Sequence, residues 1–364
     1  MKKLLFIRYR KPERIDAGGE QATNSNYRVL CSLLGEENVT TIYVHESPSK
    51  WKLIVNAFGI FYNFVKGYYY GLSPRRVNDM VRKAKDFDYV FIDRSIFGVI
   101  AGALKQDGYK GKIITFFHNV ESVYFRAKIG KNKPWCSLVE HCAFYNDNQA
   151  CRHSDTIIVL NERDRGEIAR LHGRRADLIA PIVFKDTYQL EKYPDEPCDT
   201  VPTCLFLGTY FPMNVHGILW FIREVMPHVS IRLQIVGKGM SAIESQIENK
   251  EHIEVYSDVP DLRPYIEKAD FMLLPIFEGS GMKVKTCEAL MYGKNIIGTT
   301  EAFEGYALDY EKVGALCNTR DEFIAALQDA TTHPRARFNR YAREIFLNNY
   351  SEQVKVERYK EVLF

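Results

Sequence analysis

The segment Pro275–Gly298, with the sequence PIFEGSGMKVKTCEALMYGKNIIG, combines residue types that suit anion binding. We expect an apolar strand to end at Pro275, a loop containing Gly279 and Gly281 to follow it, and a helix to begin after the loop. Glycines let a ligand approach the backbone closely, and the unpaired N–H groups of a helix start carry partial positive charge. The pattern therefore predicts a phosphate site.

Charged side chains in the same segment extend this prediction from an anion to a nucleotide. Lys283 and Lys285 would neutralise phosphate groups, and Glu288, three residues after Lys285, would lie one turn deeper on the same helix face. A carboxylate at that place could accept hydrogen bonds from a ribose diol whose diphosphate lies above it. The alternative is that both lysines are solvated and that Glu288 is their ion-pair partner.

Short apolar strands alternate with helical segments along the whole chain of 364 residues. In the first half the expected strands are Lys3–Tyr9, Thr40–Val44, Tyr89–Asp93, Lys112–His118 and Thr156–Leu160. In the second half they are Thr203–Gly208, Arg232–Val236, Ile253–Tyr256, Phe271–Pro275 and Asn295–Gly298. Nearly continuous apolar strands separated by helices are typical of parallel sheets buried on both faces. The sequence therefore predicts an α/β fold.

Length and proline spacing indicate two domains. A chain this long exceeds what one core usually serves, and Pro181–Pro202 contains four prolines and a run of acids, as a linker would. We predict an acceptor-side Rossmann-like domain over residues 1–184, a linker over 185–201, a second Rossmann-like domain over 202–345, and a final helix over 346–364 that returns to the first domain. Two doubly wound domains would face each other across a cleft, where the carboxyl ends of their strands bind ligands.

Charge is distributed unevenly between the two halves of the chain. Residues 1–185 carry 30 Lys or Arg against 19 Asp or Glu, whereas the whole chain has a net charge of only +3. A basic half suits an anionic partner such as a membrane surface or a lipid phosphate, or it is a solvated surface without a partner. Because no nucleic-acid recognition motif accompanies it, we expect no nucleic-acid partner.

Neither the cysteines nor the paired aspartates predict a metal site. Cys136, Cys142 and Cys151 are separated by six and nine residues, which fits no short pair of zinc ligands. Asp86 and Asp88 form an Asp-x-Asp pair, but the apolar strand follows the pair instead of preceding it. Because the cysteines are scattered and no signal peptide opens the chain, we expect a reduced, cytoplasmic protein without bound metal.

Residues 48–70 show apolar side chains at helical spacing, among them Trp51, Phe58 and Phe61. The uncharged run Leu53–Val65 is well short of the roughly 20 residues that cross a bilayer. It fits an interfacial helix that makes peripheral contact with the inner face of the membrane, or a wall for a polyprenyl-linked molecule. Packing against the domain's own core is the alternative.

Several stretches together resemble one enzyme family. The run Gly279–Lys294, which is Gly-Ser-Gly-x-Lys-x-Lys-x-x-Glu-Ala-Leu-x-x-Gly-Lys, resembles the donor-binding segment of retaining glycosyltransferases of the GT-B fold, family 4, the glycosyl transferases group 1 type. Leu207–Pro227 resembles the opening strand, phosphate loop and first helix of that family's donor domain, and Asp258–Pro275 resembles the approach to the donor loop. Phe117–Ser122 and the pair Gly18-Gly19 resemble first-domain elements that face the cleft.

The resemblance spans nearly the whole chain and implies a function. It implies transfer of a sugar, with retention and without metal, from a nucleotide diphosphate donor, a UDP- or GDP-sugar, to a glycan or polyprenyl-linked acceptor. The donor would be a co-substrate, and no other cofactor is implied. Such an enzyme would act in the synthesis of cell-surface polysaccharides or glycoconjugates.

The resemblance also assigns donor-binding residues, with two departures from the family pattern. Glu288 matches a glutamate that contacts the ribose, but the family's other glutamate falls on Ser280. Either Glu278 reaches in through a rearranged loop, or Ser280 and backbone groups hold the sugar. The loop after the first strand of the donor domain lacks the family's cations, so the two lysines would neutralise the diphosphate. The predicted donor-binding residues are Gly208, Thr209, Asn214, Lys238, Glu278, Ser280, Gly281, Met282 and Glu288.

Catalysis would depend on few side chains. Lys283 and Lys285 would stabilise the departing diphosphate, which itself helps to deprotonate the acceptor. His118, at the end of a first-domain strand, would donate hydrogen bonds to the sugar unless it is a structural histidine. On the acceptor side we expect the pair Gly18-Gly19 and Glu121, for which a simple turn and a helix start are the alternatives.

Two other functions share this architecture. A sugar-nucleotide 2-epimerase would need acid/base carboxylates in the cleft, and few candidates other than Glu121 and Glu278 are present. A catalytically silent protein that binds a nucleotide sugar would account for the missing motif glutamate. Conversion of the donor sugar without an acceptor would indicate the epimerase. Tight binding of the donor without turnover would indicate the silent binding protein.

Overall fold

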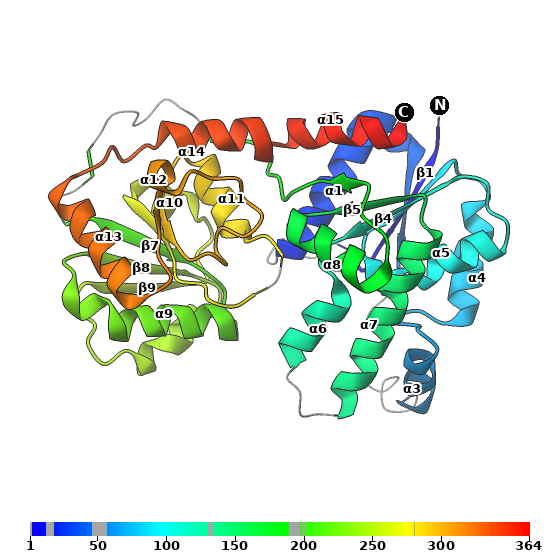
Figure 1. Ribbon diagram of the computed structural model, residues 1–364, viewed down its shortest axis with the longest axis horizontal. Helices are drawn as coiled ribbons and strands as arrows, with labels where there is room; N and C mark the ends of the chain where they lie inside the picture. Colours follow the sequence, from blue (N-terminus) through cyan, green and yellow to red (C-terminus); the bar gives the residue numbers. More distant parts are fainter. Residues whose placement is uncertain are drawn as a thin grey trace. The chain divides into compact units, whose positions relative to one another are not determined.

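The computed structural model describes residues 2–11, 18–45, 57–129, 134–188, 197–198, 201–279 and 281–364. The chain divides into two compact units, which we describe separately (Figure 1). The first unit comprises Met1–Val183 together with Lys355–Phe364, and the second comprises Phe184–Val354. Each unit contains one six-stranded sheet flanked by helices.

The first unit is built on a fully parallel sheet with the order β2-β1-β3-β4-β5-β6. Its strands are β1 (Leu4–Arg8), β2 (Val39–Tyr43), β3 (Tyr89–Ile92), β4 (Lys112–Phe117), β5 (Thr156–Val159) and β6 (Leu178–Ile179). Every residue of β1 is buried because helices cover the sheet. The strand order reverses between β1 and β3, so the carboxyl ends of these two strands form the switch point of the sheet.

Helices connect these strands, as parallel pairing requires. They are α1 (Gly18–Leu34), α3 (Ala57–Val65), α4 (Pro74–Ala84), α5 (Val99–Gln106), α6 (Glu121–Ile129), α7 (Pro134–His153) and α8 (Glu162–His172), with short 3₁₀ turns at Glu36–Asn38 and Ser95–Phe97. Local signals set their ends. Ser73 caps α4, since its hydroxyl accepts the amide of Arg76 at 3.3 Å, and Gly173, with φ of 69°, terminates α8.

The second unit has a parallel sheet with the order β12-β11-β10-β7-β8-β9. Its strands are β7 (Thr203–Leu207), β8 (Arg232–Gly237), β9 (Ile253–Ser257), β10 (Phe271–Leu274), β11 (Asn295–Gly298) and β12 (Gly314–Leu316). Its helices are α9 (Pro212–Glu224), α10 (Arg263–Lys268), α11 (Val284–Met291), α12 (Tyr310–Val313), α13 (Arg320–Thr332) and α14 (Arg340–Ile345), with 3₁₀ turns at Met226–His228 and Met240–Gln246. The order reverses between β7 and β10, which places the switch point at their carboxyl ends.

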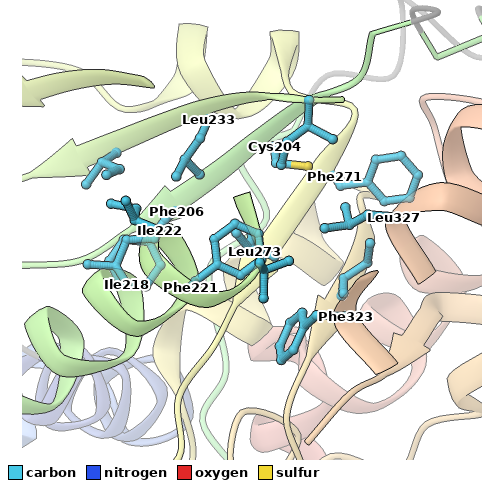
Figure 2. Packing of buried hydrophobic residues seen from close by; sticks show 14 of the residues in the cluster. Cys204, Phe206, Ile218, Phe221, Ile222, Leu233, Phe271, Leu273, Phe323 and Leu327 are labelled. Carbon is cyan, nitrogen blue, oxygen red and sulfur yellow. The ribbon is translucent and has the colours of Figure 1, made fainter. Parts of the chain in front are cut away.

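Apolar side chains from the sheet and its helices form the core of the second unit (Figure 2). Phe206 of β7 and Leu273 of β10 are fully buried, and Phe221 of α9 and Phe323 of α13 pack with their rings 5.8 Å apart. All ten strands expected from the sequence are present, which confirms the α/β fold; β6 and β12 were not expected. No helix in the described ranges is long and apolar enough to cross a membrane.

The domain boundaries differ from those expected. The described part of the predicted linker belongs to the second unit, because Asp186 Oδ1 accepts Arg343 Nη1 at 3.0 Å and the Tyr188 ring stacks on Phe338 at 5.7 Å. The predicted final helix over 346–364 is a π-helical turn, Phe346–Tyr350, followed by α15 (Glu352–Leu363). The chain returns to the first unit at Lys355 rather than at residue 346.

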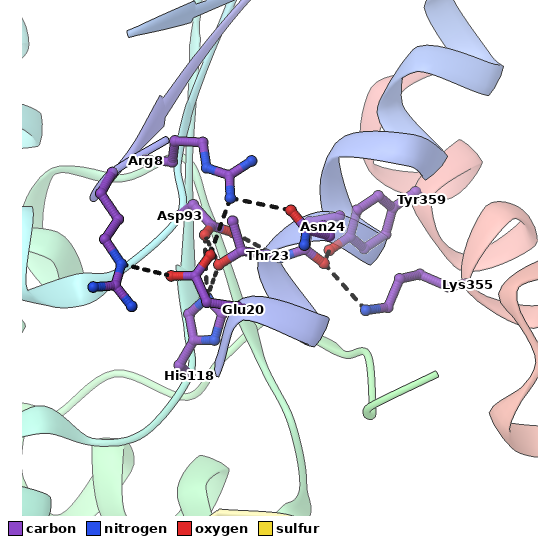
Figure 3. Close-up of polar contacts among 10 residues, drawn as sticks. Arg8, Glu20, Thr23, Asn24, Asp93, His118, Lys355 and Tyr359 are labelled. Atoms are coloured by element: carbon purple, nitrogen blue, oxygen red, sulfur yellow. Dashed lines mark hydrogen bonds and ion pairs between the residues drawn. The ribbon is translucent and has the colours of Figure 1, made fainter. Parts of the chain in front are cut away.

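A buried hydrogen-bond network fixes the last ten residues to the first unit (Figure 3). Asn26 Oδ1 on α1 accepts Tyr359 Oη at 2.7 Å and Lys355 Nζ at 3.1 Å. Asn26 Nδ2 donates to Asp93 Oδ1 at 2.8 Å. Because Lys355 is completely buried, its ammonium requires these partners, and the network therefore determines where the chain end packs.

Candidate functional site

The loops after β7 and β8 approach each other closely at the switch point of the second unit. A Cβ atom on Gly237 would lie 1.9 Å from the carbonyl oxygen of Gly208, so any side chain there would force the two loops apart. A Cβ on Gly208 would lie 3.2 Å from Cγ of Asn214. The glycines therefore bring the start of α9 against the end of β7, as a ligand site formed by backbone requires.

Lys285 joins the starts of two helices at this point. It lies in the first turn of α11, and its Nζ donates to Asn214 Oδ1, in the first turn of α9, at 3.0 Å. Asn214 Nδ2 in turn donates to the carbonyl oxygen of Thr209 at 3.0 Å. The ammonium also lies 4.6 Å from the ring centroid of Phe206. The N-termini of α9 and α11 therefore lie close together, and the Lys285 ammonium lies between them.

The charge of Lys285 is not neutralised by a neighbouring carboxylate. Among the described residues, no carboxylate oxygen lies within 4.0 Å of its Nζ. Burial, and then the nearby charge of Lys283, lower its pKa to about 7, although Glu288 acts in the opposite direction. An anion bound here would be drawn to the ammonium and would raise that pKa.

Glu288 lies one turn after Lys285 on α11, as predicted. Burial raises the pKa of its carboxyl to about 7, and Lys285 partly opposes this shift. Within the described ranges its carboxylate forms no ion pair within 4.0 Å, although its charge and that of Lys285 still influence each other's pKa. A partly buried carboxylate that forms no such close ion pair can accept hydrogen bonds from a diol.

Lys283 is differently placed from Lys285. Its Nζ donates to Glu301 Oε1 at 2.6 Å and to the carbonyl oxygen of Gly281 at 2.9 Å, and 12% of its side chain is exposed. Tyr306 Oη donates to the Lys283 carbonyl oxygen at 2.7 Å. Lys283 therefore holds the loop before α11 in shape, and Glu301 already offsets its charge. The sequence did not reveal this partner, which lies 18 residues away.

The remaining donor residues predicted from the sequence have varied surroundings. Gly281 adopts φ of 64°, which glycine permits, and Met282 is 5% exposed, so its side chain belongs to the core. Glu278 is exposed on the loop, and Lys238 is exposed while its carbonyl oxygen accepts the amide of Tyr210 at 2.8 Å. Ser280 lies outside the described residues.

In the first unit, His118 follows β4 and is 4% exposed (Figure 3). Its Nε2 lies 3.3 Å from Asp93 Oδ2 and 3.5 Å from Thr23 Oγ1. Burial lowers the pKa of His118, with Asp93 acting in the opposite direction. Nδ1 is buried and has no hydrogen-bond partner in the described structure. The structure thus gives His118 a place in a buried network, and its contact with a sugar stays a prediction.

The acceptor-side residues lie at two helix starts of the same unit. Gly18 begins α1, and a Cβ on Gly19 would lie 2.9 Å from Nη2 of Arg94. Glu121 begins α6 and is 4% exposed. Asp147 Oδ2 accepts the amide and hydroxyl of Ser122 at 3.0 and 2.9 Å, which fixes that helix start. The sequence did not indicate Arg94 or Asp147, because only the folded unit brings the loop after β3 and helix α7 to these positions.

Cavities in the described part of the first unit include one at each end of its sheet. One of about 190 Å³ is lined by Tyr9, Tyr69, Arg94, Ile96, Phe97, Glu121, Tyr124 and Phe125. The other, of about 880 Å³, lies at the opposite end of the sheet, beside Asp88 and Lys112 at the starts of β3 and β4, and contains none of the predicted site residues. No group of three or more potential metal-ligating side chains was found within the described ranges.

Comparison with known proteins agrees with this architecture. Residues 201–333 match the family described as "Glycosyl transferases group 1". No curated protein sequence matches the chain. Among solved structures, Anabaena Alr3699/HepE in complex with UDP and glucose is similar at 12% identity and a TM-score of 0.66, over 100% of this chain and 99% of that one.

Two further solved structures are similar over nearly the full length of both chains. Sucrose-phosphate synthase from Thermosynechococcus elongatus gives a TM-score of 0.72 at 13% identity, over 100% of this chain and 98% of that one. The lipopolysaccharide outer core galactosyltransferase WaaB, in its apo form, gives 0.68 at 14% identity, over 100% and 99%. These likenesses confirm the GT-B fold, and residues 201–333 are a glycosyl transferases group 1 domain, which confirms the expected enzyme class of glycosyltransferase.

Proposed function

We propose that the protein transfers a sugar from a nucleotide diphosphate donor to a glycan or lipid-linked acceptor, and that the diphosphate binds at the carboxyl ends of β7 and β10. The observation that carries this proposal is Lys285, whose ammonium joins the starts of α9 and α11 through Asn214 at 3.0 Å. Helix starts supply N–H groups and partial positive charge, and the lysine adds a full charge. A diphosphate matches this arrangement because it offers both hydrogen-bond acceptors and negative charge.

The same residues account for the chemistry of transfer. When the bond from the sugar to the diphosphate breaks, negative charge grows on the departing oxygen. Lys285 and the amides of the two helix starts would stabilise that charge without a metal ion, because they are already oriented before the reaction. Glu288, one turn deeper, would accept hydrogen bonds from the ribose. Retention of the anomeric configuration is part of the proposal on the basis of the family resemblance, and anomeric analysis of the product tests it.

The identity of the donor base is supported by one relative. The HepE structure was solved with UDP-glucose, so we propose a UDP-sugar ahead of a GDP-sugar. A thermal-shift screen of nucleotide sugars tests the donor site directly, since a ligand present at 100 times its Kd stabilises a protein by about 2.7 kcal/mol. Lys285→Ala should reduce the stabilisation to about half or less, because a tenfold weaker Kd leaves about 1.4 kcal/mol at the same ligand concentration. Lys250→Ala, at an exposed lysine of the same unit, should keep the full shift. Absence of a shift with every nucleotide sugar would refute the proposal.

We also propose that the acceptor is presented at a membrane surface, in the synthesis of a cell-surface polysaccharide or glycoconjugate. Phe61, Tyr62 and Val65 of α3 are 45%, 57% and 46% exposed. Lys66 lies beside them, with its Nζ 5.9 Å from the Tyr62 ring centroid. Exposed aromatic side chains next to a cation suit an interface with anionic lipid. The rest of the predicted segment, residues 48–56, lies outside the described residues.

A further inference from the structure

Glu301 lies at the carboxyl edge of the second sheet, beside the loop that precedes α11. It is the third residue after β11, and β11 pairs with β10, whose carboxyl end leads into the loop that contains Gly279. Glu301 Oε1 accepts Lys283 Nζ at 2.6 Å. A Cβ atom on Gly279 would lie only 3.2 Å from the same oxygen. The carboxylate therefore lies directly against the glycine loop, although it comes from a different strand of the sheet.

The backbone on both sides of Glu301 is fixed to the elements of the donor site. Thr299 Oγ1 donates to the carbonyl oxygen of Ile276, in the segment that follows β10. Thr286 Oγ1, on α11, donates to the carbonyl oxygen of Ala302 at 2.7 Å. A side chain held in this way is positioned before a ligand arrives, so less conformational entropy is lost when the ligand binds.

The pair of Lys283 and Glu301 lies beside the proposed diphosphate site. The charge of Lys283 is near enough to Lys285 to lower the pKa of that lysine, second only to the effect of burial. Lys285 connects α11 to α9, which follows β7, whereas Glu301 follows β11, on the other side of β10. The side chains of the pair are 12% and 18% exposed, so a ligand can reach them. In a nucleotide sugar, the group bonded to the diphosphate is the sugar.

Charge indicates which part of a nucleotide sugar this pair would meet. Glu301 would repel a phosphate, and it already offsets the charge of Lys283, so the pair does not suit the diphosphate. Hydroxyl groups suit it better, because a carboxylate accepts up to about four hydrogen bonds and an ammonium donates three. Neighbouring hydroxyls of a sugar ring can both donate and accept. A sugar that carries a carboxylate, as a uronic acid does, would be repelled by Glu301 in the same way as a phosphate.

We propose that Glu301, paired with Lys283, binds hydroxyl groups of the donor sugar and selects an uncharged sugar over a uronic acid. The inference rests on the proposed function, because a donor sugar presupposes a nucleotide-sugar site. It deepens that function, since it assigns sugar recognition to a side chain from the loop after β11. The sequence had left only Glu278 and Ser280, both in the loop after β10, as candidates for this role.

Calorimetric titration of the full-length protein with three ligands tests this assignment. The ligands are UDP, the tightest binder among UDP-glucose, UDP-galactose and UDP-N-acetylglucosamine, and the uronic-acid counterpart of that donor; the GDP series replaces them if UDP does not bind. Affinity for UDP reports the nucleotide site and the shape of the donor loop, whereas the difference between UDP and the UDP-sugar reports the sugar alone.

The isosteric variant Glu301→Gln should change the three affinities in different directions. We expect the Kd of UDP to stay within about twofold, and that of the uncharged UDP-sugar to rise by about fivefold or more, because a carboxylate accepts hydrogen bonds more strongly than an amide. The uronic-acid donor should bind about fivefold more tightly or better, since repulsion is lost and Lys283 is left to attract it. Glu301→Asp keeps the negative charge and should still bind the uronic-acid donor weakly. Glu248→Gln, at an exposed glutamate of the same unit, should change none of the three.

The outcomes separate this inference from the function on which it rests. The assignment of Glu301 is overturned if Glu301→Gln weakens UDP and the UDP-sugar by the same factor, because the pair would then only shape the loop. It is also overturned if the variant leaves either sugar affinity unchanged, or if the wild type binds the uronic-acid donor as tightly as the uncharged one. In each of these cases the nucleotide still binds and the proposed function stands. If neither the nucleoside diphosphates nor their sugars bind the wild type, the proposed function and this inference fail together.

Discussion

Lys285 offers the sharpest test of the donor site, because its charge and its packing can be separated. Lys285→Met removes the ammonium but keeps an unbranched side chain over the Phe206 ring, which the lysine Nζ approaches to 4.6 Å from its centroid. A methionine sulfur also packs favourably against aromatic rings. The substitution leaves Asn214 Oδ1 without its donor at 3.0 Å, but Asn214 is only partly buried and water can replace it. We therefore expect the variant to fold.

The size of the effect follows from the interaction that is lost. A hydrogen bond to a charged group contributes about 1.5–3 kcal/mol, which corresponds to a roughly 10- to 150-fold weaker Kd for the nucleotide sugar. The effect should also depend on pH. The pKa of Lys285 is lowered to about 7 in the free protein, and a bound diphosphate favours the charged form, so binding takes up a proton above pH 7. Donor affinity should fall by up to about tenfold per pH unit above 7 until the pKa of the complex is reached.

Calorimetric titration at pH 6, 7, 8 and 9, with the nucleotide sugar selected by the thermal screen, measures this dependence. Repeating each titration in buffers of different ionisation enthalpy counts the protons taken up. In Lys285→Met the decline above pH 7 should disappear. Only the smaller contribution of Glu288 should remain; the pKa of its carboxyl is about 7 with Lys285 present and rises further without that positive charge. Lys250→Met serves as the control. Our reasoning fails if wild-type affinity is constant from pH 6 to 9, or if Lys285→Met weakens binding less than twofold.

Three further substitutions test other parts of the account. Glu288→Gln should weaken nucleotide-sugar binding by about 1–2 kcal/mol, because a neutral amide accepts hydrogen bonds less strongly than a carboxylate. A nucleotide that lacks both ribose hydroxyls serves as the control and should bind the variant and the wild type equally well. Asn26→Leu removes an acceptor of Lys355 and should cost about 3–5 kcal/mol in denaturant unfolding, because it leaves a buried charge with fewer partners. A loss below about 1 kcal/mol would contradict the importance of that network. Phe61→Glu/Tyr62→Glu should abolish flotation with anionic liposomes, and unchanged flotation would remove α3 from the membrane proposal.

Much of the fold was predictable because periodicity and composition act locally. Each expected strand is a short apolar run between helical segments, and burial on both faces of a parallel sheet is what makes such a run necessary. The donor loop could also be predicted from the sequence, because its glycines, lysines and glutamate all occur within the single segment Gly279–Glu288. The positions of Lys285 and Glu288 on one helix face followed from helical geometry alone.

The tertiary structure decided which of these residues are free to act. The two lysines look equivalent in the sequence, yet Glu301 engages Lys283 at 2.6 Å while Lys285 reaches Asn214, 71 residues away. The return of the chain at Lys355 likewise depends on a partner, Asn26, that lies 329 residues earlier. A sequence determines such local patterns by spacing, but it does not state which distant groups meet. Only the packed fold brings these charges together and so determines which of them keeps its charge for a ligand.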